Sequence, residues 1–592
     1  MRGFFGKLLR INLSENAHTV EEIDDSVFRR YLGGKGLATY LLLENNKPGV
    51  DPFSPENHLI FALGPATDTS IYGSSRYGVF TKSPLTGIYS ESYSGGKTAE
   101  PMSKTGYDAI IVEGRSSGPV FLEINGGGVV FHDARDLWGK GIYETEDAVL
   151  EAVGVKGAKA VVIGPAGENL VRFALIGNDY WRSAGRTGVG AVMGSKMLKA
   201  IVFHGNAKRE VANQNLLEDL RKKTLAAAKD SVSVAGFKNL GTPMMVAVLN
   251  DVASFPTRYW AQGRFEHWEK ISAEAMRGKL GTSPRACNKC FMACGKLSVV
   301  QSGRHKGLKI EGPEYETICA FGGLCMVDSI EEIAYLNDIC DNLGIDTITA
   351  GNLAAFTIEA SRRGRISGRL DYGDVDGIAR LLHEIVDRKG TGAVLAEGIR
   401  FASREWGLED FAIHVKGLEP AGLDPRSLKG MGLAYATSDR GACHLRSTFY
   451  KPELAGISPP DQMEGKARLF VDFEDRHNIF DAMILCRFYR DLYQWNELRE
   501  IVEATTGLEL NQEDLRNIAR NISNGTRIFN IREGLTCKDD TLPRRFFEEP
   551  IEEGKVLRRD DFDRLLKEYY ELRGWDEMGV PPEYKKARGR GY

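Results

Sequence analysis

Short runs of apolar residues follow one another through the first third of the chain. They span residues 59–63, 77–80, 109–112, 120–124, 128–131, 160–163 and 200–203. Turn-forming Gly, Pro, Ser and Asp residues separate the runs, which is typical of a series of β-strands. This pattern predicts a β-sheet domain over residues 1–210.

After residue 213 the apolar positions recur at helical spacing, with polar residues between them. The clearest such segments are residues 215–229, 329–342, 353–364, 376–388 and 511–529. This spacing places apolar side chains on one face of an α-helix. We therefore expect an α+β protein, in which the β domain is followed by two mainly α-helical domains at residues 211–415 and 416–592.

Composition narrows the class of protein. Of the 592 residues, 42% are hydrophobic and 27% are charged, which is ordinary for a globular protein. The formal net charge of −4 provides no broad basic surface, so nucleic acid is not expected as a partner. No window contains the roughly 18 apolar residues of a membrane span, and the N-terminus has no signal-peptide cleavage site. Nine cysteines, an odd number, indicate reduced thiols rather than a disulfide framework, so we expect a cytoplasmic protein.

Three cysteines lie close together in the sequence, at Cys287, Cys290 and Cys294. The spacing C-x2-C-x3-C places three thiolates within reach of one metal centre. A cubane iron–sulfur cluster needs four cysteine sulfurs and accepts the fourth from a distant part of the chain. Structural zinc usually takes its ligands as two close pairs, which fits a triplet less well. The spacing favours an iron–sulfur cluster and electron transfer, with zinc and ordinary core cysteines as the alternatives.

Two further kinds of segment carry candidate chemistry. The glycine-rich stretch 185–196 lacks the residue order of a P-loop and the glycine spacing of a dinucleotide fingerprint. By itself it indicates either a phosphate site or a packing turn. Segments 341–346 and 481–486 both begin with Asp and end with a polar or thiol side chain. On the pattern alone, these are two unrelated helix ends.

Together, the cysteine triplet, segment 341–346 and the glycine-rich stretch resemble the tungsten-containing aldehyde ferredoxin oxidoreductase family. The resemblance runs in order over essentially the whole chain. Its other matching segments are residues 32–38, 81–87, 164–170, 311–316, 540–546 and 569–575. It implies a double β-sheet base and two mainly helical domains, with the cofactors at their junction.

The implied cofactors are one tungsten held by the dithiolenes of two pyranopterins and one [4Fe–4S] cluster. Because the pterins supply the sulfur ligands, the tungsten needs no metal-binding motif in the chain. Pterin dithiolenes bind molybdenum as well, so the choice between the two metals stays open.

The resemblance also implies which residues hold the pterin phosphates. They are Arg76, Tyr93, Gly95, Arg182, Ser183, Gly185 and Arg186. Small residues let backbone N–H groups approach a phosphate, and arginines add positive charge. A Mg²⁺ ion bridging the phosphates would bind the backbone carbonyl at position 93, where the family has Asn and this chain has Tyr.

The implied contacts to the rest of the cofactors come from the two Asp segments and from a loop before the second. They are Asp341, Ile345, Asp346, Arg446, Ser447, Asp481 and Leu485. A carboxylate that faces several N–H donors makes strong charge-assisted hydrogen bonds, which suits the edge of a pterin. Arg446 would bridge the cluster and a pterin, where the family usually has Lys. Outside the family, each Asp would be a helix cap or a surface charge.

Cys486 is the fourth cluster ligand that the resemblance implies. Ile484, two positions before it, stands where the family has Gly. The remaining cysteines are expected to be buried small apolar residues. They are Cys319, Cys325, Cys340, Cys443 and Cys537.

Glu316 and His444 are the catalytic residues that the resemblance implies. The reaction would be oxidation of an aldehyde to a carboxylic acid, with water as the oxygen source. We expect Glu316 to manage the protons of a water or hydroxo group and His444 to donate a hydrogen bond to the substrate oxygen. Without the family, Glu316 would be a helix cap and His444 a structural histidine.

The electrons are expected to leave one at a time through the cluster to ferredoxin or to an iron–sulfur subunit. The chain has no second cysteine cluster motif and no nicotinamide fingerprint. Some family dimers share an iron between subunits. This chain has Tyr335 and Ala379 at the corresponding positions, so any homo- or hetero-oligomer is expected to lack that iron site.

Two other functions stay open. Within the family, the alternative is the catalytic subunit of a tungsten-dependent aryl-CoA reductase complex. Outside the family, the alternative is a scaffold protein without enzymatic activity that zinc stabilises through the cysteine triplet.

Overall fold

Two six-stranded β-sheets form the N-terminal part of the chain, in a computed structural model that describes the backbone of residues 1–588 and the side-chain burial of residues 1–585. The order of the first sheet is β2 (Ala17–Glu22), β1 (Lys7–Asn12), β6 (Ala109–Glu113), β3 (Leu59–Ala62), β4 (Tyr77–Lys82) and β5 (Tyr89–Ser94). The order of the second is β11 (Arg182–Ala184), β10 (Ile176–Asn178), β9 (Lys159–Val162), β12 (Leu198–Phe203), β7 (Val120–Asn125) and β8 (Gly128–Asp133). The pairs β1–β6 and β7–β12 are parallel, and the other pairs are antiparallel.

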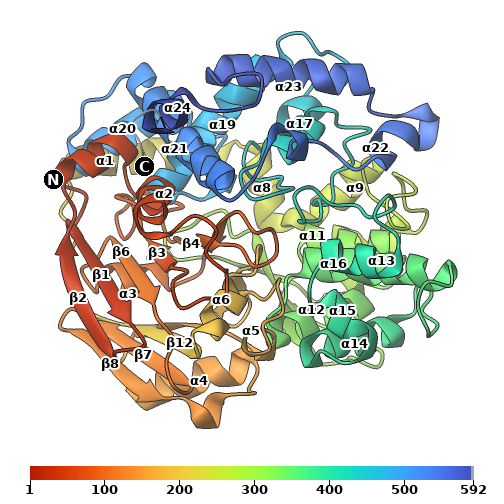
Figure 1. Ribbon diagram of the computed structural model, residues 1–592, viewed down its shortest axis with the longest axis horizontal. Helices are drawn as coiled ribbons and strands as arrows, with labels where there is room; N and C mark the ends of the chain where they lie inside the picture. The colour runs from red at the N-terminus through yellow and green to blue at the C-terminus, as the bar shows by residue number, and fades with distance from the viewer. Residues whose placement is uncertain (589–592) are drawn as a thin grey trace.

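The two sheets share one apolar core. Leu9 and Phe61 from the first sheet pack with Val161 and Ile201 from the second, so the sheets lie face to face (Figure 1). Each of the seven predicted apolar runs falls in one of these strands. The predicted double β-sheet is confirmed.

Residues 1–210 also contain helices, which the strand pattern did not predict. They are α1 (Asp25–Tyr31), α2 (Gly34–Asn45), α3 (Ala99–Ser103), α4 (Ile142–Val153), α5 (Pro165–Glu168) and α6 (Val189–Ser195). α2 is buried on most sides, because it packs against β3 and β4 and against α19 (Lys466–Met483) and α21 (Gln512–Arg532). Its apolar residues therefore form no single stripe. The β-sheet domain is therefore present as predicted, and these helices lie between its strands.

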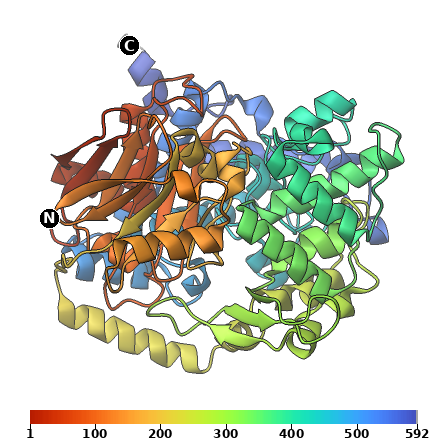
Figure 2. The ribbon, with the colours of Figure 1, turned by 90° about the horizontal axis from the view of Figure 1, so that it is seen from below.

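Helices dominate the chain after residue 213. The five predicted segments correspond to α21 and to α7 (Gln214–Lys229), α12 (Ile330–Leu343), α13 (Thr347–Arg362) and α14 (Val375–Asp387). The other helices are α8 (Val232–Asn239), α9 (Met245–Asp251), α10 (Ala273–Leu280), α11 (Tyr315–Thr317), α15 (Gly390–Leu395), α16 (Ile399–Trp406), α17 (Gly430–Thr437), α18 (Tyr450–Leu454), α20 (Trp495–Thr506), α22 (Arg545–Glu548), α23 (Arg559–Arg573) and α24 (Pro582–Arg588). Figure 2 shows α7, in yellow, along the outside of the molecule. The boundary near residue 415 stays a prediction.

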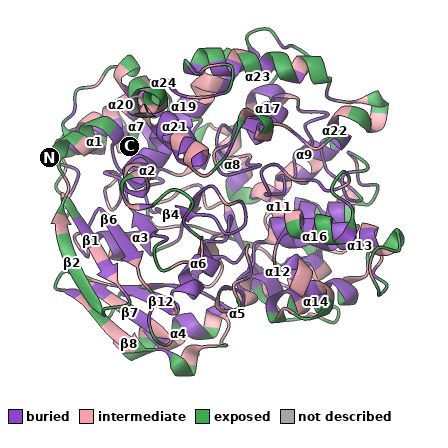
Figure 3. Cartoon of the chain, viewed as in Figure 1, coloured by how far each residue is buried: buried purple, intermediate pink, exposed green. Residues whose placement is uncertain are grey.

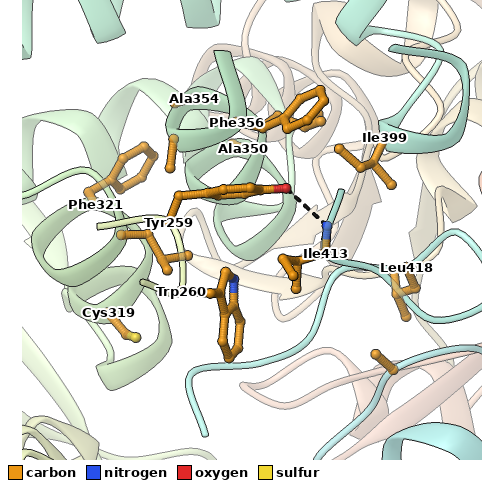
Figure 4. Packing of buried hydrophobic residues seen from close by; sticks show 14 of the residues in the cluster. Tyr259, Trp260, Cys319, Phe321, Ala350, Ala354, Phe356, Ile399, Ile413 and Leu418 are labelled. Carbon is orange, nitrogen blue, oxygen red and sulfur yellow. Dashed lines mark hydrogen bonds between the residues drawn. The ribbon is translucent and has the colours of Figure 1, made fainter. Parts of the chain in front are cut away.

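Aromatic residues pack in the core of this helical part (Figure 4). Tyr259 and Trp260 are almost fully buried, and each of them has a partner for its polar atom. The Tyr259 hydroxyl accepts the N–H of Ile413 at 3.0 Å, and Trp260 Nε1 donates to Asn352 Oδ1 at 2.9 Å. These bonds offset the cost of burying the two polar atoms.

A small third sheet lies within the helical part of the chain. It has the order β13 (Ser283–Arg285), β14 (Gly295–Val299) and β15 (Lys309–Glu311). Among the described residues, no single helix has both the length and the apolar composition of a membrane span. Only the sharply bent pair Val232–Asn239 and Thr242–Asp251 meets those two criteria, and only when the two helices are taken together.

Candidate functional site

The clustered cysteines lie on the loop between β13 and β14, and Cys486 follows the end of α19. The loop contacts the β domain, since Cys287 Sγ accepts the N–H of Gly96 at 3.1 Å. Burial raises the pKa of Cys290, and the neighbouring Cys486 and Cys287 thiols raise it further. The same two thiols act on the pKa of Cys294, which burial raises most. The structure thus brings together all four predicted cluster ligands.

The spacing of these thiols distinguishes two kinds of metal site. Within the described residues, no group of three or more His, Cys, Asp or Glu side chains is close enough to hold a single metal ion. A zinc site would bring its ligands that close. In a cubane cluster each thiolate binds a different iron, so the sulfurs lie farther apart. The cysteine triplet together with Cys486 fits a [4Fe–4S] cluster.

The burial of the other five cysteines follows the expectation with one exception. Four of them are buried, as expected: Cys319, Cys325, Cys340 and Cys443. Cys537 is the exception and is only half-buried, because it begins a short 3-10 helix that lines a surface groove.

Arg182, on β11, lies beside the cysteine loop and forms an ion pair with Glu311. Burial alone would lower the pKa of Arg182, but Cys287, Glu311 and Cys294 together hold it above its ordinary value. Gly95 approaches the same loop, since a Cβ at this position would stand 3.0 Å from Cys287 Sγ. Two of the residues predicted at the phosphates therefore lie next to the predicted cluster.

Arg76, which directly precedes β4, meets Tyr93 on β5. The Arg76 guanidinium donates to the backbone carbonyl of Tyr93 at 3.4 Å. This is the carbonyl at which the resemblance implies Mg²⁺, so the ion would have to share it with Arg76. The Mg²⁺ contact stays a prediction.

Asp346 is the N-cap of α13. Its carboxylate accepts the N–H groups of Ile348 and Thr349 at 3.1 and 3.4 Å. Its Oδ2 also accepts from Arg186 Nε at 3.0 Å, which ties the glycine-rich stretch to α13. Asp346 is therefore a helix cap, as the pattern alone suggested, and its contact to a pterin stays a prediction.

Asp341 has far fewer hydrogen-bond partners than Asp346. It lies in the last turn of α12 and accepts one hydrogen bond, from Asn337 Nδ2 at 2.6 Å. Burial raises the pKa of Asp341 well above its ordinary range, and Asp338 and Glu311 raise it further. Buried carboxyl groups normally have several partners, so Asp341 is free to accept N–H groups of a ligand.

Asp481 belongs to a network of buried ion pairs. Its Oδ2 lies 2.8 Å from Arg446 Nη1 and also binds Arg487. Arg446 pairs in turn with Glu91 on β5, whose Oε1 lies 3.1 Å from Lys35 Nζ on α2. Asp481 and Arg446 are predicted from the sequence, whereas Lys35, Glu91 and Arg487 are not. The available signal was β5 itself, a buried strand of polar residues.

Several buried polar atoms around this network have no partner in the protein. They are Arg440 Nε, Ser447 Oγ and Arg487 Nη1. Each unsatisfied buried donor or acceptor costs about 1–3 kcal/mol. A polar, anionic ligand would satisfy them, so this set of atoms fits a phosphorylated pterin.

Ser183, Gly185, Ile345 and Leu485 complete the predicted cofactor residues. Ser183 is in β11, and a Cβ on Gly185 would meet only Ser183 Oγ, at 3.4 Å. Ile345 and Leu485 are buried and each follows the end of its helix, α12 or α19. Their contacts to a cofactor stay predictions.

Glu316 and His444 lie together, although they are far apart in sequence. Glu316 Oε1 is 3.6 Å from His444 Nε2, and Glu316 Oε2 accepts the N–H of Gly422 at 2.7 Å. Glu316 is inside α11 and does not cap it. The helix continues as a π-helix over Ile318–Leu324, a form that is frequent at functional sites.

The environment sets the protonation of this pair. Burial raises the pKa of Glu316 to about 7, although Gly422 and Arg186 lower it. Burial also lowers the pKa of His444 far below its ordinary value, and Arg186 and Arg440 lower it further. At neutral pH the imidazole is therefore neutral, and the carboxyl exchanges its proton readily.

Glu316 and His444 line a cavity of about 720 Å³. Its walls are largely apolar: Val232, Phe237, Met244, Met245, Val248, Leu249, Leu423, Leu445, Leu454, Ala455 and Phe488. Other polar groups come from Ser233, Thr242, Glu314, Tyr315, Tyr450, Lys451 and Arg490. The cavity suits an apolar molecule whose polar end meets the carboxyl and the imidazole.

Comparison with known proteins gives matches over nearly the whole chain. Residues 8–205 match the family model of the aldehyde ferredoxin oxidoreductase N-terminal domain, and residues 219–588 match the model of domains 2 and 3. The tungsten-containing aldehyde ferredoxin oxidoreductase of Pyrococcus abyssi is 39% identical over 99% of this chain and 98% of that protein.

Two other relatives have different activities. The WOR-like subunit of the aliphatic sulfonate oxidoreductase of Pyrococcus furiosus is 31% identical over 98% of this chain and 96% of that protein. The solved active-site complex BamBC of benzoyl coenzyme A reductase, in complex with 1,5-dienoyl-CoA, includes a chain that is 26% identical. It superposes with a TM-score of 0.85 over 100% of this chain and 98% of that one.

Proposed function

Because the chain belongs to the aldehyde ferredoxin oxidoreductase family, we propose that it is a tungsten–pterin enzyme that oxidises aldehydes to carboxylic acids. Water supplies the oxygen atom. The electrons pass through a [4Fe–4S] cluster to ferredoxin or to an iron–sulfur partner subunit. The observation that carries the proposal is the Glu316–His444 pair in the wall of a largely apolar cavity, in a chain 39% identical to an aldehyde oxidoreductase.

Different residues bind different parts of the cofactors. Cys287, Cys290, Cys294 and Cys486 hold the cluster. Asp341 offers a carboxyl group with one protein donor to the N–H edge of a pterin. Arginines with unpartnered N–H groups face the anionic part of the cofactor. When bound, the tungsten pterin takes up the two electrons of the oxidation.

Glu316 and His444 handle the proton and the substrate oxygen. Glu316 Oε1 accepts a proton from the attacking water, because its pKa of about 7 permits both protonation states near neutral pH. The neutral His444 has a buried Nδ1 without a partner, and an N–H there would donate to the aldehyde oxygen. The apolar walls exclude bulk water and orient the hydrocarbon part of the aldehyde.

The second candidate function is reduction of an aromatic ring in a coenzyme A thioester. The full-length superposition on the benzoyl coenzyme A reductase complex favours it. Aldehyde oxidation is favoured by the higher sequence identity, 39% against 26%. The two functions differ in substrate, so they are separable by assay.

The test is anaerobic purification followed by metal analysis and a substrate panel. We expect about one tungsten and about four iron atoms per chain. Reduction of a viologen dye should depend on added aldehyde, and apolar aldehydes should have the lower KM. Dye reduction by no aldehyde, together with turnover of benzoyl coenzyme A by the reduced protein, would reject the first candidate in favour of the second. Zinc alone, without iron or tungsten, would reject both.

A further inference from the structure

A second, much smaller cavity lies against the buried ion network. Its volume is about 20 Å³, which is enough for one water molecule. Four of the residues that line it each have a buried polar atom without a protein partner. These atoms are Ser438 Oγ, Asp439 Oδ1, Arg446 Nε and Arg527 Nη2. A buried water typically makes roughly two to four hydrogen bonds, so this cavity has the size and the walls of a water site.

On one side the cavity connects to residues at the proposed cofactor site. Asp439 Oδ2 accepts from Lys35 Nζ at 2.6 Å, and Lys35 Nζ also lies 3.1 Å from Glu91 Oε1. Glu91 Oε2 accepts the Tyr93 hydroxyl at 2.6 Å. Tyr93 and Arg446 are among the residues proposed to hold the cofactors. A continuous chain of hydrogen bonds therefore runs from the small cavity to that site.

On the other side the cavity connects to the surface. Lys416 lines the cavity, and its Nζ lies 2.7 Å from Asp540 Oδ1. Asp540 Oδ2 accepts the Tyr570 hydroxyl at 2.5 Å. Asp540 and Tyr570 line a groove of about 1250 Å³ along α23. Figure 3 shows the outer face of α23 exposed at the edge of the molecule.

We propose that this cavity holds a water molecule that completes a proton route from the cofactor site to the groove along α23. The proposal rests on the proposed function, because one aldehyde and one water yield one acid, two electrons and two protons. The electrons leave through the cluster, and the apolar walls of the large cavity oppose the passage of protons. The protons leave through Glu91, Lys35, Asp439, the water, Lys416 and Asp540.

Each step passes a proton between neighbouring groups, directly or through the proposed water, and no other bond forms or breaks. Burial and neighbouring charges shift the pKa values of Asp439 and Lys416, the two groups on either side of the water. Burial raises the pKa of Asp439, with Glu91 adding to the effect and Lys35 opposing it. Burial lowers the pKa of Lys416, although Asp540 opposes the change. Both pKa values therefore shift from their ordinary values in the direction of neutral pH.

The test compares Asp439→Asn with wild type, both loaded with cofactors. Asn keeps the shape and an acceptor for Lys35 but cannot take a proton. Aldehyde-dependent dye reduction per tungsten should fall by about tenfold, less than the 10²–10⁴ of a direct proton donor. The solvent deuterium isotope effect should rise, because proton transfer becomes the slow step. Asp540→Asn should show both effects.

A second measurement does not depend on turnover. Reduction of the loaded wild-type protein should produce the infrared band of a protonated carboxyl group, and Asp439→Asn should lose this band. The matched control is Glu168→Gln. Glu168 is the buried partner of Lys199 in the β domain, so this variant should leave the rate, the isotope effect and the band unchanged.

A wild-type rate and isotope effect in both Asn variants would overturn the route. So would a loss of rate that only follows a loss of tungsten, because the residues would then be structural. A wild-type protein that oxidises no aldehyde would instead overturn the proposed function. In that case the infrared band still decides whether Asp439 takes up a proton.

Discussion

The pH dependence of aldehyde oxidation tests the role of Glu316. Because burial raises its pKa to about 7, the carboxylate that accepts a proton forms mainly above neutral pH. Below about pH 6 its ionised fraction falls about tenfold per pH unit, whereas an exposed Glu with a pKa of about 4.3 stays ionised. We expect kcat/KM to rise by about tenfold between about pH 5.5 and 7 and to level off above about pH 8.

The assay is the initial rate of viologen reduction per tungsten across this pH range. Glu316→Gln should lower the rate by about 10²–10⁴ and remove the acidic limb of the profile. The matched control is Glu146→Gln. Glu146 is a buried carboxyl of the β domain whose pKa burial also raises to about 7, and it is outside the cavity. A Glu316→Gln variant that keeps the acidic limb, or a Glu146→Gln variant that loses it, would refute the reasoning.

The raised pKa of Glu316 also lowers the stability of the folded protein at higher pH. The folded protein keeps the proton of Glu316 up to about pH 7, whereas the unfolded chain loses it near 4.5. Stability is therefore fully present below about pH 4.5 and is lost as the pH rises through 7, by about 3 kcal/mol at 1.36 kcal/mol per pH unit. In denaturant unfolding, Glu316→Gln should be more stable than wild type at pH 8 and equal to it at pH 4.5. Equal stability at both pH values would contradict this ionisation cost.

Three other substitutions test the cluster, the backbone and the cavity. Cys486→Ser should lower the iron content below about four atoms per chain. The control Cys340→Ala should keep the full iron content. Equal iron contents in the two variants would show that Cys486 does not bind the cluster. Ile484 has φ +54°, so Ile484→Gly should be more stable to denaturant than Ile484→Ala by about 1 kcal/mol, and the usual order, with Ala above Gly, would contradict this. Leu454→Trp should raise KM for bulky aldehydes and leave it unchanged for small ones; equal changes would place the substrate elsewhere.

The sequence predicted elements whose side-chain pattern is simple. The apolar run 109–112 is predictable because β6 is buried on both faces. Helix α2 is not, because it is buried on most sides and its Gly34 touches the backbone of another helix: a Cβ there would stand 2.2 Å from the Asp481 carbonyl. Strand β5 escaped prediction because its buried residues are polar. The charged partners of this strand explain why its buried residues are polar, and these partners are identified only in the structure.

The same contrast holds for the candidate site. The cysteine triplet is local, so its spacing alone indicates a cluster. The pair Lys35–Asp439 joins residues 404 positions apart, and the family-matching segment 32–38 does not indicate the partner of Lys35. The resemblance to a family supplied Glu316 and His444, but it could not supply the pKa of about 7, which depends on the burial that folding creates. The structure was therefore needed to show which residues form ion pairs and which side chains are protonated.

The buried arginines connect the chemistry of the site to the stability of the fold. Arg440 and Arg487 each keep an unpartnered N–H group in the interior, at about 1–3 kcal/mol for each group. A protein that folded only for stability would replace such groups with apolar side chains. Their retention is explained if an anionic cofactor supplies the missing acceptors. Since such a ligand binds the folded chain and not the unfolded one, cofactor loading stabilises the junction between the sheets and the helices.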